Sequence, residues 1–191
     1  ICSAGSRLVV ARAVHDALLE RLLARVRRLP LAHGLRDAGM GPLISAAQRE
    51  RVAGFVERAA ARGHVPLCGG HRAADPETGA GWFYEPTVFD ALPPDDECVQ
   101  QEIFGPVLAL QVFDELDEAV ALANGTPYAL VAGVYTRDFG RAHRLARELD
   151  AGQVYLNEYF AGGIALPFGG NRRSGFGREK GLEALRSYSR V

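Results

Sequence analysis

The residue best suited to covalent chemistry in this chain is the cysteine at position 2. Cys2 lies in the stretch Ile1-Cys2-Ser3-Ala4-Gly5-Ser6-Arg7, whose small side chains leave room for a reactant beside the thiol. The nucleophilic form of cysteine is the thiolate, which needs an electropositive, partly open setting. Backbone N–H groups or a cation such as Arg7 can supply it. The alternative is that Cys2 is a small buried apolar residue, and composition alone favours that alternative.

A second candidate is Glu102, which begins the stretch Glu102-Ile103-Phe104-Gly105-Pro106-Val107 ahead of a predicted strand. A carboxylate there can accept hydrogen bonds from two vicinal hydroxyls, as a ribose presents them, while an adjacent ring covers an apolar face. Taken alone, an acidic residue before a strand is more often simply solvated.

The third candidate is the glycine-rich stretch 167–181, with five glycines in fifteen residues. It lacks the dinucleotide fingerprint G-x-G-x-x-G, because Gly175-Phe176-Gly177 is followed by the next glycine only at position 181. We therefore interpret most of it as a structural loop. None of the five histidines has H-x-x-x-H or H-E-x-x-H spacing, and the three cysteines form no CxxC pair, so we expect no metal site.

The elements that position these residues alternate between strands and helices, which predicts an α/β fold with a mostly parallel sheet covered by helices. In the second half of the chain we expect strand 107–113, helix 115–124 capped by Asp114, strand 129–135, helix 138–149, strand 153–157 and a long loop over 158–181.

The first half of the chain contains two helical periodicities. After a strand at 7–13, the spacing of Val14, Leu18, Leu22, Val26 and Leu29 predicts an amphipathic helix that Pro30 ends. Ser45 and Gln48 have capping-box spacing and open a second helix, with Val52, Val56 and Ala59 facing inward and Gly63 just past its end. Short strands at 65–69 and near 83–89 and a helix start at 93–96 follow.

Composition indicates a soluble globular domain, because 48% of the residues are apolar and 24% are charged. A net charge of −1 gives no basic excess, so neither nucleic acid nor an acidic membrane is an expected partner. No apolar run approaches the ~18 residues that would cross a bilayer, and no secretory signal is recognisable. We therefore expect a cytoplasmic protein.

Taken together, the three stretches give the chain a resemblance that none gives singly. It resembles the catalytic-domain portion of the NAD(P)-dependent aldehyde dehydrogenases, and the resemblance extends over essentially all 191 residues. Its carriers are the stretches 1–7 and 102–107, Asn157 followed ten residues later by Pro167-Phe168-Gly169-Gly170, and the tail Ser174-Gly175-x-Gly177-Arg178-Glu179. The resemblance implies a three-layer α/β/α sandwich with a mostly parallel sheet.

The resemblance also implies roles for individual residues. Cys2 becomes the catalytic thiol, Glu102 binds the nicotinamide-side ribose of NAD or NADP, and Phe104 packs beside that ribose. Other matched positions are Gln48 and Arg51 near the cofactor, Phe160, Gly162 and Phe168 at the aldehyde entrance, and Arg178 and Glu179 as supporting residues at the active site and interface. The entrance is mostly apolar, which favours an apolar or aromatic aldehyde over a charged one.

In the family's chemistry the thiolate adds to an aldehyde, hydride passes to the nicotinamide, and water hydrolyses the resulting thioester. An Asn side chain that holds the oxyanion and a general-base Glu precede the cysteine in the family, as does the coenzyme-binding domain. We therefore expect residues 1–191 to be a fragment, the catalytic domain without its coenzyme-binding domain and C-terminal oligomerisation strand. This fragment should be inactive alone, and the full-length enzyme should be a homodimer or homotetramer.

Three other functions remain open from the sequence. One is a non-catalytic structural or interaction module that kept the fold. Another is a cysteine hydrolase that pairs Cys2 with a histidine. A third, within the family, is a CoA-acylating enzyme in which thiolysis replaces hydrolysis.

Overall fold

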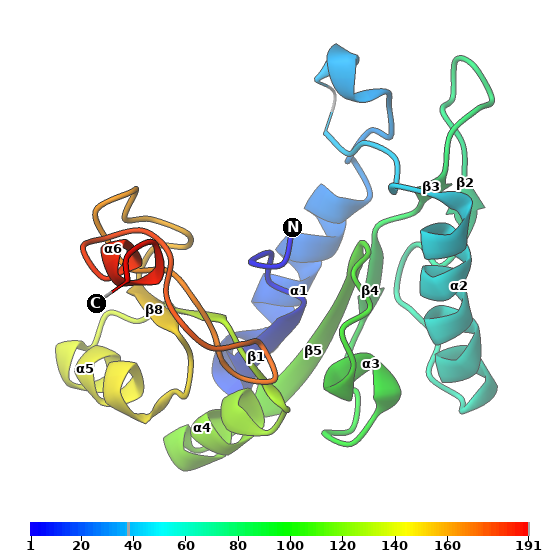
Figure 1. Cartoon of the computed structure of the whole chain (residues 1–191). Coiled ribbons are helices and arrows are strands. Elements are labelled where there is room, and N and C mark those ends of the chain that lie inside the picture. Colours follow the sequence, from blue (N-terminus) through cyan, green and yellow to red (C-terminus); the bar gives the residue numbers. More distant parts are fainter. Residues whose placement is uncertain (38, 191) are drawn as a thin grey trace. The chain divides into compact units, whose positions relative to one another are not determined.

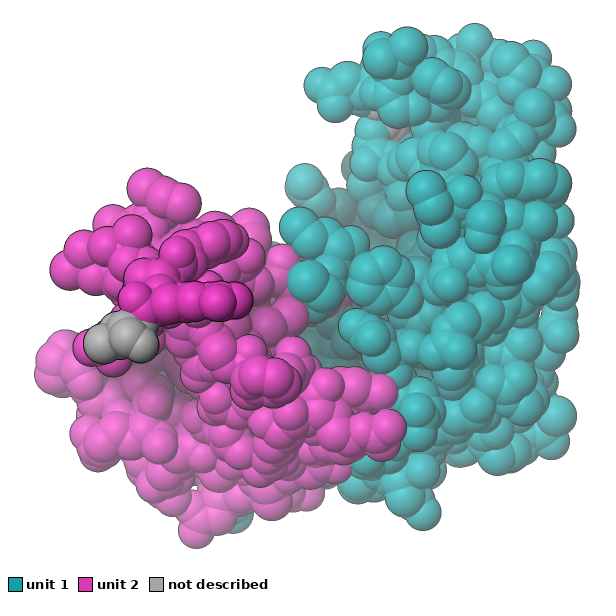
Figure 2. Space-filling view, in the orientation of Figure 1, with its two compact units in different colours: residues 1–2, 6–115 teal, residues 3–5, 116–191 magenta. Residues whose placement is uncertain are grey.

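The structure of the chain is a computed structural model that describes residues 1–37 and 39–190. The chain divides into two compact units (Figures 1 and 2). Unit 1 contains Ile1–Cys2 and Ser6–Glu115, and unit 2 contains Ser3–Gly5 and the chain from Leu116 onward. Each unit has its own parallel strands and its own helices, so the predicted α/β fold is confirmed.

A three-stranded parallel sheet forms the centre of unit 1, with strand order β1-β5-β4 (Figure 1). The strands are β1 (Arg7–Ala11), β5 (Val107–Phe113) and β4 (Thr87–Phe89). The middle strand β5 is an almost continuous apolar run, as expected for a strand that is covered on both faces. The prediction for 107–113 is confirmed, whereas the first strand ends two residues earlier than predicted.

Helix α2 (Ala46–Ala61) provides most of the helical contribution to the core of unit 1. Its N-cap is Ser45, whose hydroxyl accepts a hydrogen bond from the Gln48 amide at 3.2 Å, as the sequence predicted. The predicted inward face is also confirmed, because Val52, Val56 and Ala59 are buried. The short helix α3 (Glu97–Gln100) packs against α2.

Helix α1 differs from its prediction. It covers Arg12–Val26, so it starts directly after β1 and ends before Leu29. The amides of Arg28 and Leu29 donate to the carbonyls three residues earlier, as in a 3₁₀ turn. The helix contacts β1 and β5, but none of its residues is buried, and Val14 remains 54% exposed. The predicted inward-facing apolar side is thus only partly covered by the described residues.

His15 on α1 lies between two carboxylates. Its side chain is 14% exposed, and Nε2 lies 2.9 Å from a carboxylate oxygen of Asp90 while Nδ1 lies 2.7 Å from one of Asp16. The hydrogen bond with Asp90, and then that with Asp16, raises the pKa of His15. His15 therefore ties α1 to the loop after β4.

Two predicted strands of unit 1 are shorter or absent. Residues 65–69 form only an isolated bridge, Cys68 to Val88, because the next residues turn with positive φ at Gly69 and Gly70. The strand near 83–89 is divided into β3 (Phe83–Tyr84) and β4, since Pro86 between them has no N–H to donate. The segment β2 (Arg72–Ala73) pairs with β3 in an antiparallel hairpin.

Unit 2 repeats the alternation of strands and helices. A parallel pair, β7 (Val131–Val134) with β8 (Gln153–Leu156), and an antiparallel pair, β6 (Tyr128–Ala129) with β9 (Asn171–Arg172), form its sheets. The helices are α4 (Leu116–Asn124), α5 (Phe139–Glu148) and α6 (Ala184–Ser187). Every predicted element of this half is present within one or two residues, apart from a break that divides strand 129–135; β9 and α6 were not predicted.

The predicted loop 158–181 is confirmed except for β9 and a bridge between Phe168 and Glu179. Glycine is required where this loop returns to the start of β8. A Cβ on Gly152 would lie 1.6 Å from the carbonyl oxygen of Gly169. No helix in residues 1–37 and 39–190 is both long and apolar enough to cross a membrane.

Candidate active site

The turn that carries Cys2 is anchored on its C-terminal side. The hydroxyl of Tyr159 donates a 2.9 Å hydrogen bond to the carbonyl of Ser3, and a Cβ on Gly5 would lie 3.4 Å from the same hydroxyl. Burial raises the pKa of Tyr159, so this hydroxyl keeps the proton that it donates. The Ser6 carbonyl accepts a bond from the Ala109 amide of β5 at 3.0 Å. One side-chain and one backbone hydrogen bond therefore fix the residues that follow Cys2.

Cys2 is exposed, so it is not the small buried apolar residue of the alternative interpretation. The other two thiols have different surroundings. Cys98 is buried with its Sγ 3.8 Å from the carbonyl of Phe55, and burial raises its pKa to about 12. Burial also raises the pKa of half-buried Cys68. Cys2 is therefore the thiol that a solute can reach most easily.

The first two turns of α2 hold the Glu102 segment through the backbone of that segment. The carboxamide of Gln48 donates to the carbonyls of Ile103 at 3.1 Å and Phe104 at 2.9 Å, and the guanidinium of Arg51 donates to the carbonyl of Glu102 at 2.8 Å. In a capping box the Gln side chain returns to the N-cap amide. Here the Gln48 side chain bonds the neighbouring loop instead, so only half of the predicted box forms.

The loop that α2 holds has a constrained backbone. Phe104 adopts φ +58°, a left-handed conformation that costs energy in a residue with a side chain. The next residue must be glycine, because a Cβ on Gly105 would lie 2.4 Å from Cγ2 of the fully buried Val52. The result is an exposed Glu102 and a half-exposed Phe104 ring on one short loop. A carboxylate and a ring so presented could bind a vicinal diol and cover its apolar side.

The remaining predicted residues gather in unit 2. The rings of Phe160 and Phe168 meet edge to face with centroids 6.2 Å apart. Phe168 and Glu179 exchange two backbone hydrogen bonds of 2.6 and 2.8 Å. The Arg178 guanidinium donates to the carbonyl of Gly170 at 2.9 Å and to Oδ1 of Asn171 at 2.8 Å. Arg178 and Glu179 thus fix the backbone of the turn that carries Phe168.

Gly162, the third residue predicted at the entrance, has φ +110° and faces the Leu166 side chain, which an added Cβ would meet at 2.6 Å. The structure therefore brings together Gln48, Arg51, Glu102 and Phe104 in unit 1, and Phe160, Phe168, Arg178 and Glu179 in unit 2. Among the described residues of unit 1, no hydrogen bond or ion pair joins Cys2 to the group around Glu102.

Two residues have roles that the sequence did not predict. The bond of Tyr159 to Ser3 joins residues 156 positions apart, which no local pattern could reveal. The second is Lys180, the one lysine beside 21 arginines in the sequence, whose ammonium lies over both Phe160 and Phe168. The signal available in the sequence was that this one lysine lies in the glycine-rich stretch 167–181.

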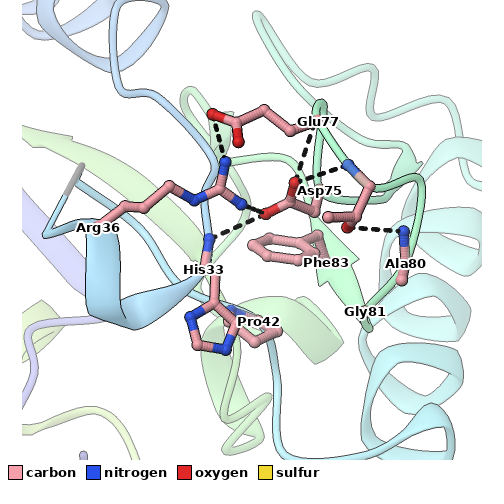
Figure 3. A pocket seen from close by; sticks show the side chains of 9 residues that line it. His33, Arg36, Pro42, Asp75, Glu77, Ala80, Gly81 and Phe83 are labelled. Atoms are coloured by element: carbon pink, nitrogen blue, oxygen red, sulfur yellow. Dashed lines mark hydrogen bonds and ion pairs between the residues drawn. The ribbon is translucent and has the colours of Figure 1, made fainter.

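A pocket of about 330 Å³ lies elsewhere in unit 1, between η1 (Gly34–Arg36) and the turn after β2 (Figure 3). Its buried Asp75 carboxylate accepts from the backbone amides of His33, Glu77 and Thr78 and pairs with Arg36. These bonds, led by that with Arg36, lower the pKa of Asp75. The carboxylate therefore holds the turn together. Within the described residues there is no cluster of three or more His, Cys, Asp or Glu that could hold a metal ion.

Comparison with known proteins gives one consistent result. The whole chain, residues 1–191, matches the model of the aldehyde dehydrogenase family. The chain is 41% identical to 4-trimethylaminobutyraldehyde dehydrogenase of Rattus norvegicus over 194 residues and 41% identical to betaine aldehyde dehydrogenase of Mesorhizobium japonicum over 192 residues. Each alignment covers 100% of this chain but only 39% of the relative.

Solved structures agree. The betaine aldehyde dehydrogenase of Staphylococcus aureus in complex with NAD+ is 36% identical and superposes with a TM-score of 0.94 over 98% of this chain and 38% of that one. An NAD-dependent aldehyde dehydrogenase from Sinorhizobium meliloti is 39% identical, with a TM-score of 0.94 over 100% of this chain and 37% of that one. The chain thus spans just under two fifths of the proteins that it matches.

Proposed function

Because the chain belongs to the aldehyde dehydrogenase family, we propose that it supplies the catalytic part of an enzyme that oxidises an aldehyde to a carboxylic acid with NAD(P)+. The observation that carries the proposal is the accessible Cys2 on a turn anchored by Tyr159 and β5. The other two cysteines are buried or half-buried, with raised pKa values.

In the proposed reaction the Cys2 thiolate adds to the aldehyde carbon and forms a thiohemiacetal. The oxyanion of this adduct needs hydrogen-bond donors, and in the family the backbone N–H of the cysteine is one of them. A fixed turn favours this role, because a donor that is already oriented loses little entropy when the charge develops. Loss of hydride then leaves a thioester on Cys2.

The residues of the Glu102 loop fit the cofactor that the family uses. An exposed carboxylate accepts hydrogen bonds from the two hydroxyls of a ribose, and the Phe104 ring beside it offers an apolar face. NAD(P)+, when bound, supplies the acceptor for the hydride. We propose that Glu102 and Phe104 contact its nicotinamide-side ribose, and that Gln48 and Arg51 hold the loop and approach the cofactor.

The thioester must be released by water, or by CoA in an acylating relative. The general-base Glu that activates the water in the family precedes the catalytic cysteine, as do the oxyanion Asn and the coenzyme-binding domain. We therefore propose that residues 1–191 act as the catalytic domain of a larger enzyme, and that these residues alone oxidise no aldehyde. A purified 191-residue chain that produced NAD(P)H from an aldehyde would contradict this.

The substrate is proposed only by class. The aromatic residues at the proposed entrance favour an aldehyde with an apolar or aromatic body. The relatives named above act, by their names, on 4-trimethylaminobutyraldehyde and betaine aldehyde.

The test uses the protein expressed with whatever sequence flanks residues 1–191 in its gene. Production of NAD(P)H, followed by its absorbance, is compared among wild type, Cys2→Ser and the control Cys68→Ser. We expect Cys2→Ser to lose activity by about a thousandfold or more, as removal of a nucleophile does, and Cys68→Ser to keep it. Equal activity in Cys2→Ser and wild type would overturn the assignment.

A non-catalytic module is the main competing function, and thiol reactivity distinguishes it. Alkylation of Cys2 by iodoacetamide at neutral pH should be faster than that of a model thiol if the site activates the sulfur. An ordinary rate, together with absent dehydrogenase activity, would favour the module.

A further inference from the structure

The only lysine of the chain lies against the two aromatic rings of the proposed aldehyde entrance. The Nζ of Lys180 is 5.3 Å from the ring centroid of Phe168 and 6.0 Å from that of Phe160. Both distances are within the range in which the negative face of a ring attracts a cation. The two rings meet edge to face, so they form an aromatic pair with one cation already bound.

The backbone fixes Lys180 in this place. The residue before it exchanges two hydrogen bonds with Phe168. The residue after it, Gly181, donates to the carbonyl of Ile164 at 2.9 Å and approaches Pro167 so closely that a Cβ would lie 2.9 Å from its Cδ. Lys180 itself has φ +60°, a conformation that must be held by its surroundings. The backbone of Lys180 is therefore held by a constrained loop, at a place from which the ammonium reaches both rings.

We propose that Lys180 is a specificity-determining residue, which discriminates against aldehydes with a positively charged tail and favours those with a negatively charged tail. The inference rests on the proposed function, in which Phe160 and Phe168 line the aldehyde entrance. The sequence predicts a mostly apolar entrance, whereas in the structure the ammonium of Lys180 lies against the rings of Phe160 and Phe168.

Two physical effects act in the same direction. The ammonium occupies the ring faces that could otherwise attract a quaternary ammonium group. It also repels a second cation and attracts a carboxylate by Coulomb interaction, which at about 6 Å in a partly solvated site changes relative affinities by about tenfold. A neutral tail is subject to neither effect. The preference is therefore a matter of charge and should not depend on the size of the tail.

The first experiment measures binding with no reaction. Tetramethylammonium chloride is titrated into wild type, Lys180→Met and Lys180→Arg while the aromatic NMR signals of Phe160 and Phe168 are followed. Met keeps the length of the side chain but removes the charge. Lys180→Met should bind the probe about tenfold more tightly than wild type, and Lys180→Arg, which keeps a cation on the rings, should resemble wild type. Neopentyl alcohol, uncharged and of similar shape, should show no difference among the three proteins.

The second experiment measures turnover with shape-matched aldehydes in the protein with its gene-encoded flanking sequence. One pair is betaine aldehyde and 3,3-dimethylbutanal, which differ in a quaternary nitrogen against a carbon, and the other is 4-oxobutanoate and 4-methylpentanal, in which an isopropyl end replaces the carboxylate. Lys180→Met should raise the first charged-to-neutral ratio of kcat/KM and lower the second, each by about tenfold. The control Arg173→Met, which removes an exposed cation elsewhere in unit 2, should leave both ratios unchanged.

The outcomes separate the two proposals. Charge ratios in Lys180→Met that stay within about twofold of wild type, or equal tetramethylammonium affinity in the two proteins, would overturn the role of Lys180. If none of these aldehydes is oxidised by wild type, the proposed function fails, and the tetramethylammonium titration alone decides whether Lys180 blocks the aromatic pair.

Discussion

Replacing Gln48 by Met tests whether the start of α2 holds the proposed ribose-binding loop. The substitution keeps side-chain length and helix propensity but removes the donors to the carbonyls of Ile103 and Phe104, at 3.1 and 2.9 Å. Each such bond contributes about 0.5–1.5 kcal/mol net, and the Phe104 carbonyl can still find water. We therefore expect the local opening free energy of the loop to fall by about 1–2 kcal/mol.

Amide hydrogen exchange measures this opening directly, because it reports local as well as global unfolding. A loss of 1–2 kcal/mol corresponds to exchange about 5–30-fold faster in a peptide that covers residues 103–107. The backbone amide of Gln48 still caps to Ser45, so exchange in the body of α2 should not change. Gln101→Met, an exposed neighbour, is the matched control. Unchanged exchange at 103–107 in Gln48→Met would refute the positioning role.

Three further outcomes follow from packing and charge. Gly105→Ala overfills the contact with α2 and should lower the free energy of unfolding, measured by urea denaturation, by about 1–3 kcal/mol. The control Gly41→Ala, with open space around it, should change this free energy little. Because bonding lowers the pKa of Asp75, its carboxylate stabilises the fold above about pH 4 and this stabilisation is lost as the pH falls further. Asp75→Asn should reduce the urea midpoint of unfolding at pH 7, and this midpoint should then fall less steeply as the pH is lowered below about 4. The same dependence of the midpoint on pH as in wild type would contradict this. Because the bond with Asp90 raises the pKa of His15, the imidazolium stabilises the fold below about pH 6.5 and this contribution disappears as the pH rises through the folded-state pKa. Thermal melts of His15→Gln at a series of pH values should lack that decline in Tm. The same dependence of Tm on pH in His15→Gln and wild type would refute the prediction.

The elements that local patterns predicted well are those whose signal is contained in a few residues. The Ser45 cap and the inward face Val52, Val56 and Ala59 follow from helical spacing, and β5 from a continuous apolar run. Predictions failed where a contact with a distant segment decides the outcome, as at Gly69, where a Cβ would lie 2.2 Å from the carbonyl oxygen of Pro86. The segment 65–69 resembles a strand, but the positive φ values of Gly69 and Gly70 turn the chain after one bridge.

The candidate site was predicted by residue type more completely than by geometry. Spacing identified Cys2 and Glu102 as chemical groups, and the resemblance added Phe104, Phe160 and Phe168. The contacts that hold these residues could not be predicted, because they join positions far apart in the chain. Examples are Gln48 with Phe104, 56 residues apart, and Tyr159 with Ser3.

The most direct measurement is the identification of the residue that carries the acyl group during turnover. The protein with its gene-encoded flanking sequence is mixed with an aldehyde and NAD(P)+, quenched in acid within one turnover and digested for mass spectrometry. A peptide containing Cys2 should gain the mass of the aldehyde less two hydrogens, as a thioester requires. Acylation at Cys68 or Cys98, or steady formation of carboxylate with Cys2 never modified, would contradict the mechanism.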